Sequence, residues 1–399
     1  MVSNNMEKLG SVRSVIREIF EYGNKRAQEI GRENVFDFSL GNPSVPTPQF
    51  VTDTLLDLIN NESPLALHSY TSATGDNNVR KAIAEHLNVQ NGTSFGPENI
   101  YITTGAAAAL SITIKALAEN ENDEFIVLAP FFPEYKVFIE SAGAKTVVVK
   151  CRESDFQIDF SALKASINKN TKGIIINSPC NPSGVVFSEQ TISELCNVLY
   201  AAQQTYSKEI FIIADEPYRE IVYRNISVPF IPNFYDNTII CYSFSKSLSL
   251  AGERIGYILV SNKTADPTLI FNAVAGAGRA LGYVCAPSLF QKILPVCLGK
   301  TADISVYEKN RDILYDELTS YGYEIPQPDG AFYLFIKALE PDAVKFCENA
   351  KKFELLLVPS DSFGYEGYVR ISYCVSTQQI INSLPAFKKL AEGYKRGEF

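Results

Sequence analysis

The sequence predicts an α/β protein whose large domain has a mostly parallel sheet between helices, with a smaller α+β domain after it. Two features carry this prediction. Short apolar runs alternate with helical segments from about residue 99 to residue 260. Beyond residue 290, a long helical stretch precedes three separated strands and a final helix. With 399 residues, the chain is long enough to bury the core of each domain.

The N-terminal part predicts one helix and one short strand. Apolar residues are spaced over 12–30 as on one face of an amphipathic helix. A membrane-surface helix is disfavoured there, because the polar face mixes both charge signs. Residues 36–40 predict a strand that ends at Gly41-Asn42-Pro43. We expect residues 1–45 to join the small domain.

The large domain is predicted at residues 46–290. Because helical segments separate its strands, the sheet should be mostly parallel and buried. Ligands of such sheets bind beyond the carboxyl ends of the strands, where Thr104-Gly105, Asn177-Ser178, Asp215 and Ser243 lie in this sequence. The predicted strands are 100–103, 125–128, 145–149, 173–177, 210–214, 238–242 and 254–260.

The small domain is predicted at residues 291–399. A long helix at 301–321 leads to strands at 331–336, 354–358 and 368–372, and a last helix covers 377–392. The sequence contains no internal repeat and no low-complexity segment.

Composition excludes several classes of protein. The net charge of −9 argues against nucleic-acid binding, which needs a basic face. No apolar run is as long as a membrane span, and charges at positions 7, 8, 13 and 17 argue against a secretory signal. Eight cysteines without Cys-x-x-Cys spacing and only two histidines argue against a zinc site or a disulfide framework. We therefore expect reduced thiols, a cytoplasmic protein and no metal.

The most informative stretch runs from Ser243-Phe244-Ser245-Lys246 to Gly252-Glu253-Arg254-Ile255-Gly256. It combines a lysine flanked by hydroxyls with an arginine two helical turns on. Upstream, Asp215 closes an apolar run. This set suits a Schiff base between Lys246 and an aldehyde cofactor that carries a phosphate and a basic ring nitrogen.

These residues resemble the pyridoxal-phosphate attachment signature of class I/II aminotransferases. The resemblance covers roughly residues 30 to 390 and implies an aspartate aminotransferase-like fold, with pyridoxal phosphate as cofactor. It also implies ping-pong transfer of an amino group from an α-amino acid to a 2-oxo acid. Further matches, in the family's order, are Asn181-Pro182-Ser183-Gly184, Asp215-Glu216-Pro217-Tyr218 and Tyr368-Val369-Arg370-Ile371-Ser372, with weaker ones at Gly41, Tyr70-Thr71 and Gly330-Ala331-Phe332-Tyr333.

The resemblance gives roles to the residues around the cofactor ring. It implies that Lys246 forms the Schiff base and later moves the substrate's α-proton, and that Asp215 pairs with the protonated ring nitrogen. Tyr218 and Asn181 would hydrogen-bond the ring phenolate oxygen. The alternatives without a catalytic role are a surface position for Lys246, a helix N-cap for Asp215 and a turn residue for Asn181.

The phosphate group would be held by main-chain and side-chain donors. Residues Gly105-Ala106-Ala107 follow a strand and open a helix, where N–H groups and the helix dipole favour an anion. This loop has no hydroxyl or amide, so Ser243, Ser245 and Arg254 would supply the side-chain contacts. On its own, the alanine run would predict only an ordinary helix.

Two aromatic residues have weaker assignments. Phe132 resembles the aromatic residue that stacks on the cofactor ring, although packing with Phe131 in the core is the alternative. Tyr70 resembles the tyrosine that reaches the phosphate of the neighbouring subunit's cofactor. That role predicts a homodimer with shared active sites; otherwise Tyr70 is a half-buried loop residue.

Substrate binding is assigned to Arg370, Gly41 and Asn181. A guanidinium group matches the substrate α-carboxylate with two parallel bonds, so Arg370 is the candidate clamp, and Gly41 and Asn181 would complete it. A surface salt bridge is the alternative for Arg370. The glycines of 276–282 superficially match a dinucleotide-binding loop but follow a predicted helix rather than a strand. Within them, Arg279 is a candidate contact to an acidic substrate side chain or a structural residue at a subunit interface.

Two other functions stay open. A carbon–sulfur lyase of the same fold would share all these motifs, because the choice of reaction depends on residues of the distal pocket. A pyridoxal-phosphate-sensing effector domain of a transcriptional regulator would need a basic winged-helix module ahead of it. About thirty residues precede the region of resemblance, too few for such a module.

Overall fold

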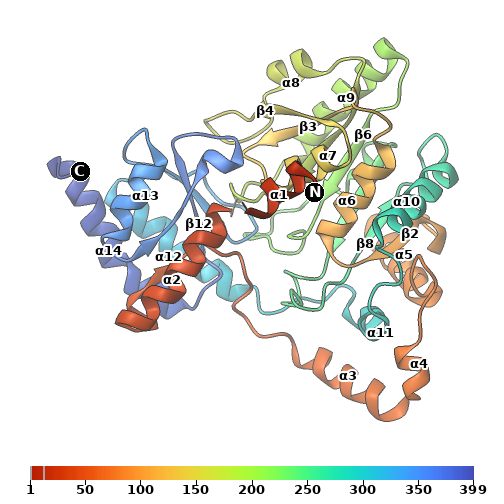
Figure 1. Ribbon diagram of the computed structural model, residues 1–399, viewed down its shortest axis with the longest axis horizontal. Coiled ribbons are helices and arrows are strands. Elements are labelled where there is room, and N and C mark those ends of the chain that lie inside the picture. Colours follow the sequence, from red (N-terminus) through yellow and green to blue (C-terminus); the bar gives the residue numbers. More distant parts are fainter. Residues whose placement is uncertain (1, 12–13) are drawn as a thin grey trace.

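The computed structural model describes residues 2–11 and 14–399 and confirms the predicted α/β class. Figure 1 shows two lobes. The large lobe, residues 49–298, contains the larger sheet with helices around it. The small lobe, residues 305–396, contains the C-terminal helices and short strands, and the N-terminal helix α2 lies beside it.

Within the described residues, the larger sheet has seven strands in the order β2-β8-β7-β6-β5-β3-β4. Strands β3 to β7 pair in parallel, whereas β8 runs antiparallel to both of its neighbours. The sheet is therefore mostly parallel, as predicted. Its strands are β2 (Ile100–Thr103), β3 (Glu124–Ala129), β4 (Lys145–Lys150), β5 (Thr171–Asn177), β6 (Phe211–Asp215), β7 (Thr238–Ser243) and β8 (Gly256–Val260).

Helices cover the central strands of this sheet, and β6 and β7 are buried along their whole length. Helix α6 packs against β6, β7, β8 and α10, and α5 packs against β2 and α11. The helices of the large lobe are α3 (Gln49–Asn61), α4 (Pro64–His68), α5 (Asn77–Asn91), α6 (Ala106–Leu117), α7 (Glu134–Ser141), α8 (Phe160–Ser166), α9 (Glu189–Tyr206), α10 (Pro267–Leu281) and α11 (Ser288–Cys297), with 3-10 turns at Pro97–Asn99 and Ile231–Asn233.

The N-terminal segment contains α1 (Asn4–Ser11), α2 (Val15–Ile30), a 3-10 turn (Arg32–Asn34) and β1 (Phe36–Asp37). The predicted helix at 12–30 corresponds to α2, and its residues 12 and 13 lie outside the described part of the chain. The predicted strand at 36–40 is too long. It stops at Asp37 because this carboxylate accepts hydrogen bonds from the N–H of Ser39 at 2.9 Å and from its hydroxyl at 2.6 Å, which turns the chain.

The small lobe contains α12 (Ser305–Tyr321), β9 (Tyr333–Lys337), α13 (Ala343–Lys351), β10 (Leu355–Leu356), β11 (Val358–Pro359), a 3-10 turn (Ser360–Phe363), β12 (Tyr368–Ser372) and α14 (Thr377–Arg396). An antiparallel sheet has the order β11-β12-β9, and β10 pairs in parallel with β1. The single strand predicted at 354–358 is wrong, because its residues divide between these two sheets. Glu354, with φ of 58°, cannot continue an extended strand.

Each lobe has its own hydrophobic core. The first includes the strands of the larger sheet and Leu294 of α11. The second includes Phe38, Leu314 of α12 and Ile371 of β12. Arg26 of α2 forms an ion pair with Glu354 at 2.6 Å, which ties the N-terminal helix to the small lobe. The domain boundaries at residues 45 and 290 stay predictions. No helix in the described ranges is both long and apolar enough to span a membrane.

Candidate active site

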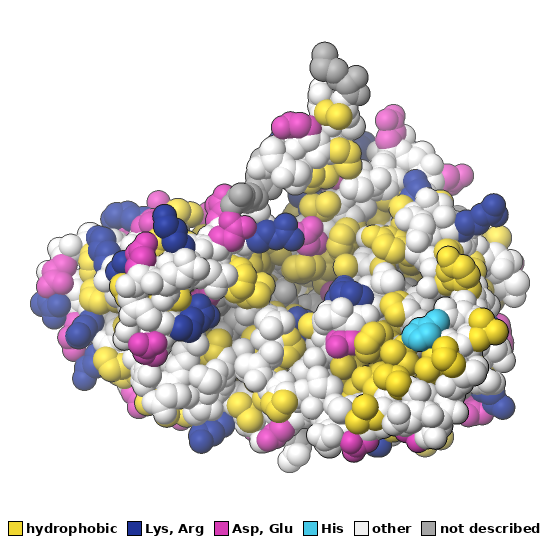
Figure 2. Space-filling model, turned by 60° about the horizontal axis from the view of Figure 1, so that its bottom comes forward, with side chains coloured by type: hydrophobic (Ala, Val, Ile, Leu, Met, Phe, Trp, Pro, Cys, Tyr) yellow, Lys and Arg dark blue, Asp and Glu magenta, His cyan; other side chains and the backbone are white. Residues whose placement is uncertain are grey.

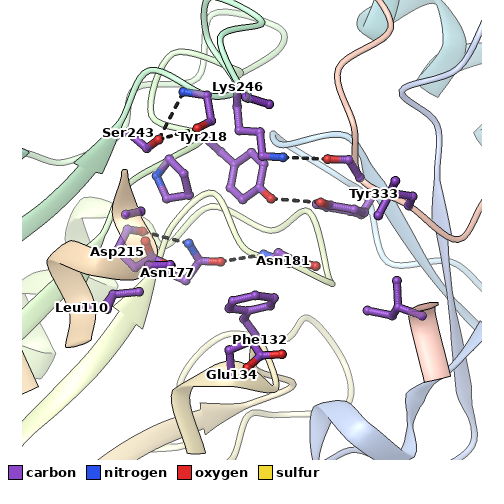
Figure 3. Close-up of a pocket in the computed structure, with 18 of the residues that line it drawn as sticks. Leu110, Phe132, Glu134, Asn177, Asn181, Asp215, Tyr218, Ser243, Lys246 and Tyr333 are labelled. Carbon is purple, nitrogen blue, oxygen red and sulfur yellow. Dashed lines mark hydrogen bonds between the residues drawn. The ribbon is translucent and has the colours of Figure 1, made fainter. Parts of the chain in front are cut away.

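A cavity of about 370 Å³ lies where the two lobes meet. Its floor is formed by the carboxyl ends of β5, β6 and β7 and by the start of α6, as expected for an open parallel sheet. Side chains of α2, β9 and β12 line the opposite side. Figure 3 shows Lys246 and Tyr218 facing Phe132 across this space. Twelve of the residues predicted for the site line this cavity: Gly41, Ala106, Ala107, Phe132, Asn181, Asp215, Tyr218, Ser243, Ser245, Lys246, Arg254 and Arg370.

Lys246 reaches into the cavity from the turn that follows β7. Its Nζ donates a hydrogen bond to the carbonyl oxygen of Gly41 at 2.6 Å and lies 5.6 Å from the ring centre of Phe332. Burial lowers the pKa of Lys246 to about 8, and the cations Arg254 and Arg370 act in the same direction. A lysine with a lowered pKa is available as a neutral nucleophile and base near neutral pH.

Asp215 ends β6 and is only 5% exposed. Its Oδ2 accepts a hydrogen bond from the hydroxyl of Tyr135 at 2.5 Å, whereas Oδ1 is buried and has no partner among the described residues. Burial raises the pKa of Asp215 to about 7, Glu216 adds to this rise, and the bond from Tyr135 opposes it. The alternative of a helix N-cap is wrong, because residues 216–220 form turns and open no helix.

Tyr218 and Asn181 also face the cavity. The hydroxyl of Tyr218 lies 2.9 Å from that of Tyr333 on β9, so the two lobes meet at this bond. The N–H of Asn181 donates to Oδ1 of Asn177 at 2.7 Å, and Nδ2 of Asn177 donates to the carbonyl oxygen of Asp215 at 2.8 Å. The Asn177 amide therefore holds two strand ends in register, as Figure 3 shows.

Arg370 of β12 is 2% exposed, so the alternative of a surface salt bridge is wrong. Its Nη1 donates to Oδ1 of Asn181 at 3.1 Å, and its Nη2 donates to the carbonyl oxygen of Ser39 at 2.5 Å. Its Nε is buried without a partner in the described part of the chain. Its Cζ lies 4.8 Å from the ring centre of Tyr333. A buried cation that lacks a carboxylate is suited to an anionic ligand.

The corner where the sequence predicts a phosphate site combines the start of α6 with the loop after β7. Gly105 precedes α6 with φ of 85°, and a Cβ there would lie 2.8 Å from Nη2 of Arg254. Nη1 of Arg254 donates to Oγ of Ser245 at 3.4 Å, and the hydroxyls of Ser243 and Ser245 are 2.8 Å apart. The first N–H groups of α6 have no acceptor within the helix, so this corner concentrates donors for an anion.

The chain between Lys246 and Arg254 forms turns rather than helix. The expectation of two helical turns between them is therefore wrong. Arg254 has φ of 53°, so β8 begins at Gly256 rather than at residue 254. These turns bring the guanidinium back toward Gly105 at the start of α6.

Of three further residues considered for the site, one lines the cavity and two lie outside it. Phe132 lines the cavity and contacts Tyr135 edge to face, with ring centres 5.7 Å apart. Tyr70 is 94% exposed and lies outside the cavity of its own chain, so the alternative of a half-buried residue is wrong. Arg279 is exposed on α10, also away from the cavity. The glycines of 276–281 lie inside α10, and Gly282 ends it, so no dinucleotide-binding loop is formed.

Sequence reasoning assigned no role to several residues in or beside the cavity. Tyr135, which lies outside the cavity, had no local signal for a site. Tyr333 stood in the weak family match Gly330-Ala331-Phe332-Tyr333 but had no role of its own. Arg17 and Phe20 of α2 line the cavity although they are more than 200 residues before Lys246 in the sequence. Asn177 had a signal of its own, since it stands at the carboxyl end of a predicted strand.

The chain is similar to known proteins over almost its whole length. The family model for aminotransferase class I and II matches residues 33–386. The crystal structure of an amino transferase from Eubacterium rectale is 56% identical, covers 99% of both chains and has a TM-score of 0.97. A probable aspartate/prephenate aminotransferase from Aquifex aeolicus is 27% identical over 90% of this chain and 91% of its own length. An aspartate aminotransferase from Pyrococcus horikoshii is 29% identical over 96% of each chain.

Proposed function

The chain belongs to the class I and II aminotransferases, and we propose that it works with pyridoxal phosphate attached to Lys246. Aminotransferase activity is the function of the proteins that it matches over nearly full length. These matches favour an aminotransferase over the carbon–sulfur lyase and over the non-catalytic effector domain. Its substrates are accordingly amino acids and 2-oxo acids. The finer assignments of cofactor, residues and assembly are proposals that rest on the cavity.

The residues present fit pyridoxal phosphate at three separate points. A buried lysine nitrogen is available for the aldehyde. The free Oδ1 of Asp215 is a buried acceptor that needs a donor such as a protonated ring nitrogen. The corner formed by Gly105, Ser245 and Arg254 supplies donors for the phosphate. The observation that carries the proposal is that Lys246 and the unpartnered oxygen of Asp215 face one cavity.

When bound, pyridoxal phosphate supplies an aldehyde that takes up the amino group and a ring that withdraws electrons from the α-carbon. Arg370 binds the substrate carboxylate and so orients the bond that breaks at the α-carbon. When it is not bound to the cofactor, Nζ of Lys246 would take up the substrate's α-proton and pass it on, a role that its lowered pKa favours. Asp215 would hold the ring nitrogen, while Tyr218 and Asn181 would orient the ring.

Walls on both sides position the ring and limit access of water. Phe132 lies across the cavity from Lys246 and offers an apolar face for stacking. Helix α2 closes the outer side with Ile16 and Phe20. Leu40 and Gly41 complete this wall. A largely apolar enclosure strengthens the hydrogen bonds within it. It also excludes water, which slows premature hydrolysis that would release the amino group.

A single half-reaction tests this function. The cofactor-loaded protein is mixed with each amino acid in turn, without a 2-oxo acid, and the products are counted. Transamination releases one oxo acid per active site and then stops until a 2-oxo acid is added. Repeated release of ammonia or pyruvate from the amino acid alone would instead indicate a lyase.

We also propose that the preferred substrates carry a second carboxylate. The names of two relatives include aspartate and prephenate, and both of these molecules have one. Arg17 of α2 lines the cavity and forms no ion pair with any described residue, so it is free to bind a distal carboxylate. Arg279 would reach a site only from a neighbouring subunit. Comparing Arg17→Gln with Arg279→Gln for dicarboxylic and neutral substrates separates the two positions.

A homodimer with shared active sites remains our proposal for the assembly. Tyr70 is almost fully exposed, and apolar residues around it, including Leu65, Tyr283 and Val284, are exposed as well. Figure 2 shows hydrophobic side chains gathered on the face that carries α3 and α4. Such a patch fits a subunit interface. Sedimentation of the protein and of Tyr70→Asp tests this, because a monomeric wild type would exclude shared sites. The cytoplasmic location stays a prediction.

A further inference from the structure

Tyr135 supports Asp215 from outside the cavity. It lies in the first turn of α7 and is 2% exposed. Its hydroxyl donates to Oδ2 of Asp215 at 2.5 Å, on the side away from the free Oδ1. Tyr135 does not line the cavity, whereas Asp215 does. The tyrosine therefore acts on the site only through the carboxylate.

We propose that Tyr135 is a positioning residue that fixes the carboxylate of Asp215 with Oδ1 toward the cavity and favours its ionised form. This inference rests on the proposed function, in which Oδ1 holds the proton of the cofactor's ring nitrogen. A carboxylate held by one oxygen has its other oxygen in a defined place. It is also a better acceptor when it carries its charge.

The surroundings of Asp215 give it no other support. Among the described residues, Tyr135 is the one donor to its side chain, and no cation pairs with it. The titratable groups around it are Cys180, Glu216, Tyr218 and Cys241, none of which carries a positive charge. Burial alone would protonate such a carboxylate near neutral pH. The hydroxyl of Tyr135 works against this, and burial beside Asp215 raises its own pKa, so it stays a neutral donor.

The start of α7 holds Tyr135 in place. Its N–H donates to the carbonyl oxygen of Phe132 at 3.0 Å, and the two rings meet edge to face. Phe132 lines the cavity three residues earlier in the sequence. One short segment thus provides both an apolar wall for the ring and the support for its acidic partner.

Tyr135→Phe tests the proposal, with Tyr242→Phe as its matched control. Tyr242 is also buried and donates to a half-buried carboxylate, Oε1 of Glu220, at 2.8 Å, but it lies outside the active-site cavity. Each variant removes one buried hydroxyl that donates to a carboxylate, so an effect of lost stability alone should appear in both. The readouts on the cofactor-loaded proteins are the dissociation constant of pyridoxal phosphate, the pH midpoint of its absorbance, and kcat.

In Tyr135→Phe we expect roughly tenfold weaker cofactor binding and a fall of at least that size in kcat, the effect of losing one bond to a charged group. The pH midpoint should rise by about one unit, because Nζ of Lys246 keeps its proton longer when the ring nitrogen has lost its own. In Tyr242→Phe all three should match the wild type. Equal values in the two variants would overturn the proposal.

A second variant covers the case in which Tyr135→Phe does not fold. A difluorinated tyrosine at position 135 is nearly isosteric and donates a stronger hydrogen bond, so the pH midpoint should fall. An unchanged or raised midpoint would overturn the proposal. If the wild type forms no covalent cofactor complex at Lys246, the proposed function fails and takes this inference with it. A normal wild type with an unaffected Tyr135→Phe removes this inference alone.

Discussion

Replacing Arg370 by lysine should separate the recognition of the substrate carboxylate from the chemistry at Lys246. In the structure, the guanidinium is buried and held in place by Asn181 at 3.1 Å and Ser39 at 2.5 Å. Its Nε has no partner within the described residues, and its Nη atoms bond an amide oxygen and a backbone carbonyl oxygen rather than a carboxylate. The substrate carboxylate would neutralise this cation with two parallel bonds. A lysine keeps the charge but offers a single point of contact.

The expected loss follows from the number of bonds. A hydrogen bond between charged groups contributes roughly 1.5–3 kcal/mol, so losing one of two bonds should lower kcat/KM by roughly 10- to 150-fold. Burial lowers the pKa of Arg370, which shows that its charge is poorly solvated without a ligand. Cofactor binding should change less than kcat/KM, because Arg370 bonds neither Asp215 nor the corner formed by Gly105, Ser245 and Arg254, and touches the proposed cofactor site only through Asn181.

The assay compares an amino acid with an amine that has the same side chain but no carboxylate, in the half-reaction with bound cofactor. Arg370→Lys should slow the amino acid and leave the amine unchanged. Arg26→Lys is the matched control, since Arg26 forms an ion pair with Glu354 in the same lobe but lies outside the cavity. An equal loss for both substrates, or no loss for the amino acid, would refute the assignment of the clamp.

Four further outcomes are expected. Cofactor-free Lys246→Met should be more stable than the wild type at pH 7 by about 1–3 kcal/mol. The difference should shrink as pH rises from about 8 to 10, because the ammonium group of Lys246 loses its proton near pH 8 in the folded protein but only near pH 10.4 in the unfolded chain. Urea unfolding across this pH range measures the difference. Asp215 should lower the stability of the cofactor-free protein as pH rises from about 4 to 7, because folded Asp215 keeps its proton up to about 7. The fall should therefore be smaller in Asp215→Asn, which should also bind the cofactor more weakly; an equal fall in both proteins would contradict the shifted pKa. Gly105→Ala should weaken cofactor binding in equilibrium dialysis, since its φ of 85° strains alanine and its Cβ would displace Arg254; unchanged affinity would argue against a phosphate at this corner. Arg17→Gln should lower kcat/KM about tenfold for dicarboxylic substrates and not for neutral ones, and equal effects on both would exclude a distal contact.

Strands of the larger sheet could be predicted closely because parallel strands covered on both faces are continuous apolar runs. The predicted strand at 210–214 differs from β6 by one residue at each end. Strand ends governed by local geometry could not be predicted. Arg254 and Glu354 both have positive φ, and no residue type at these positions signals it. Asp37 ends β1 through bonds to Ser39, a turn that an alternating apolar pattern hides.

In the candidate site, too, some residues could be predicted from the sequence and others could not. Residues near strand ends or within the lysine motif could be named in advance, because chemistry there requires particular side chains at short spacing. The supporting tyrosines could not be, since Tyr135 and Tyr333 reach Asp215 and Tyr218 from distant parts of the chain. Arg17 depends on how α2 folds across the opening, which is a property of the tertiary structure alone.

Chemical trapping of the cofactor tests the central claim most directly. The cofactor-loaded protein is reduced with borohydride, digested, and its peptides are sequenced by mass spectrometry. We predict one pyridoxyl group per chain on the peptide that contains Lys246, and none in Lys246→Met. A pyridoxyl group on another lysine, or a protein that takes up no cofactor, would contradict the account.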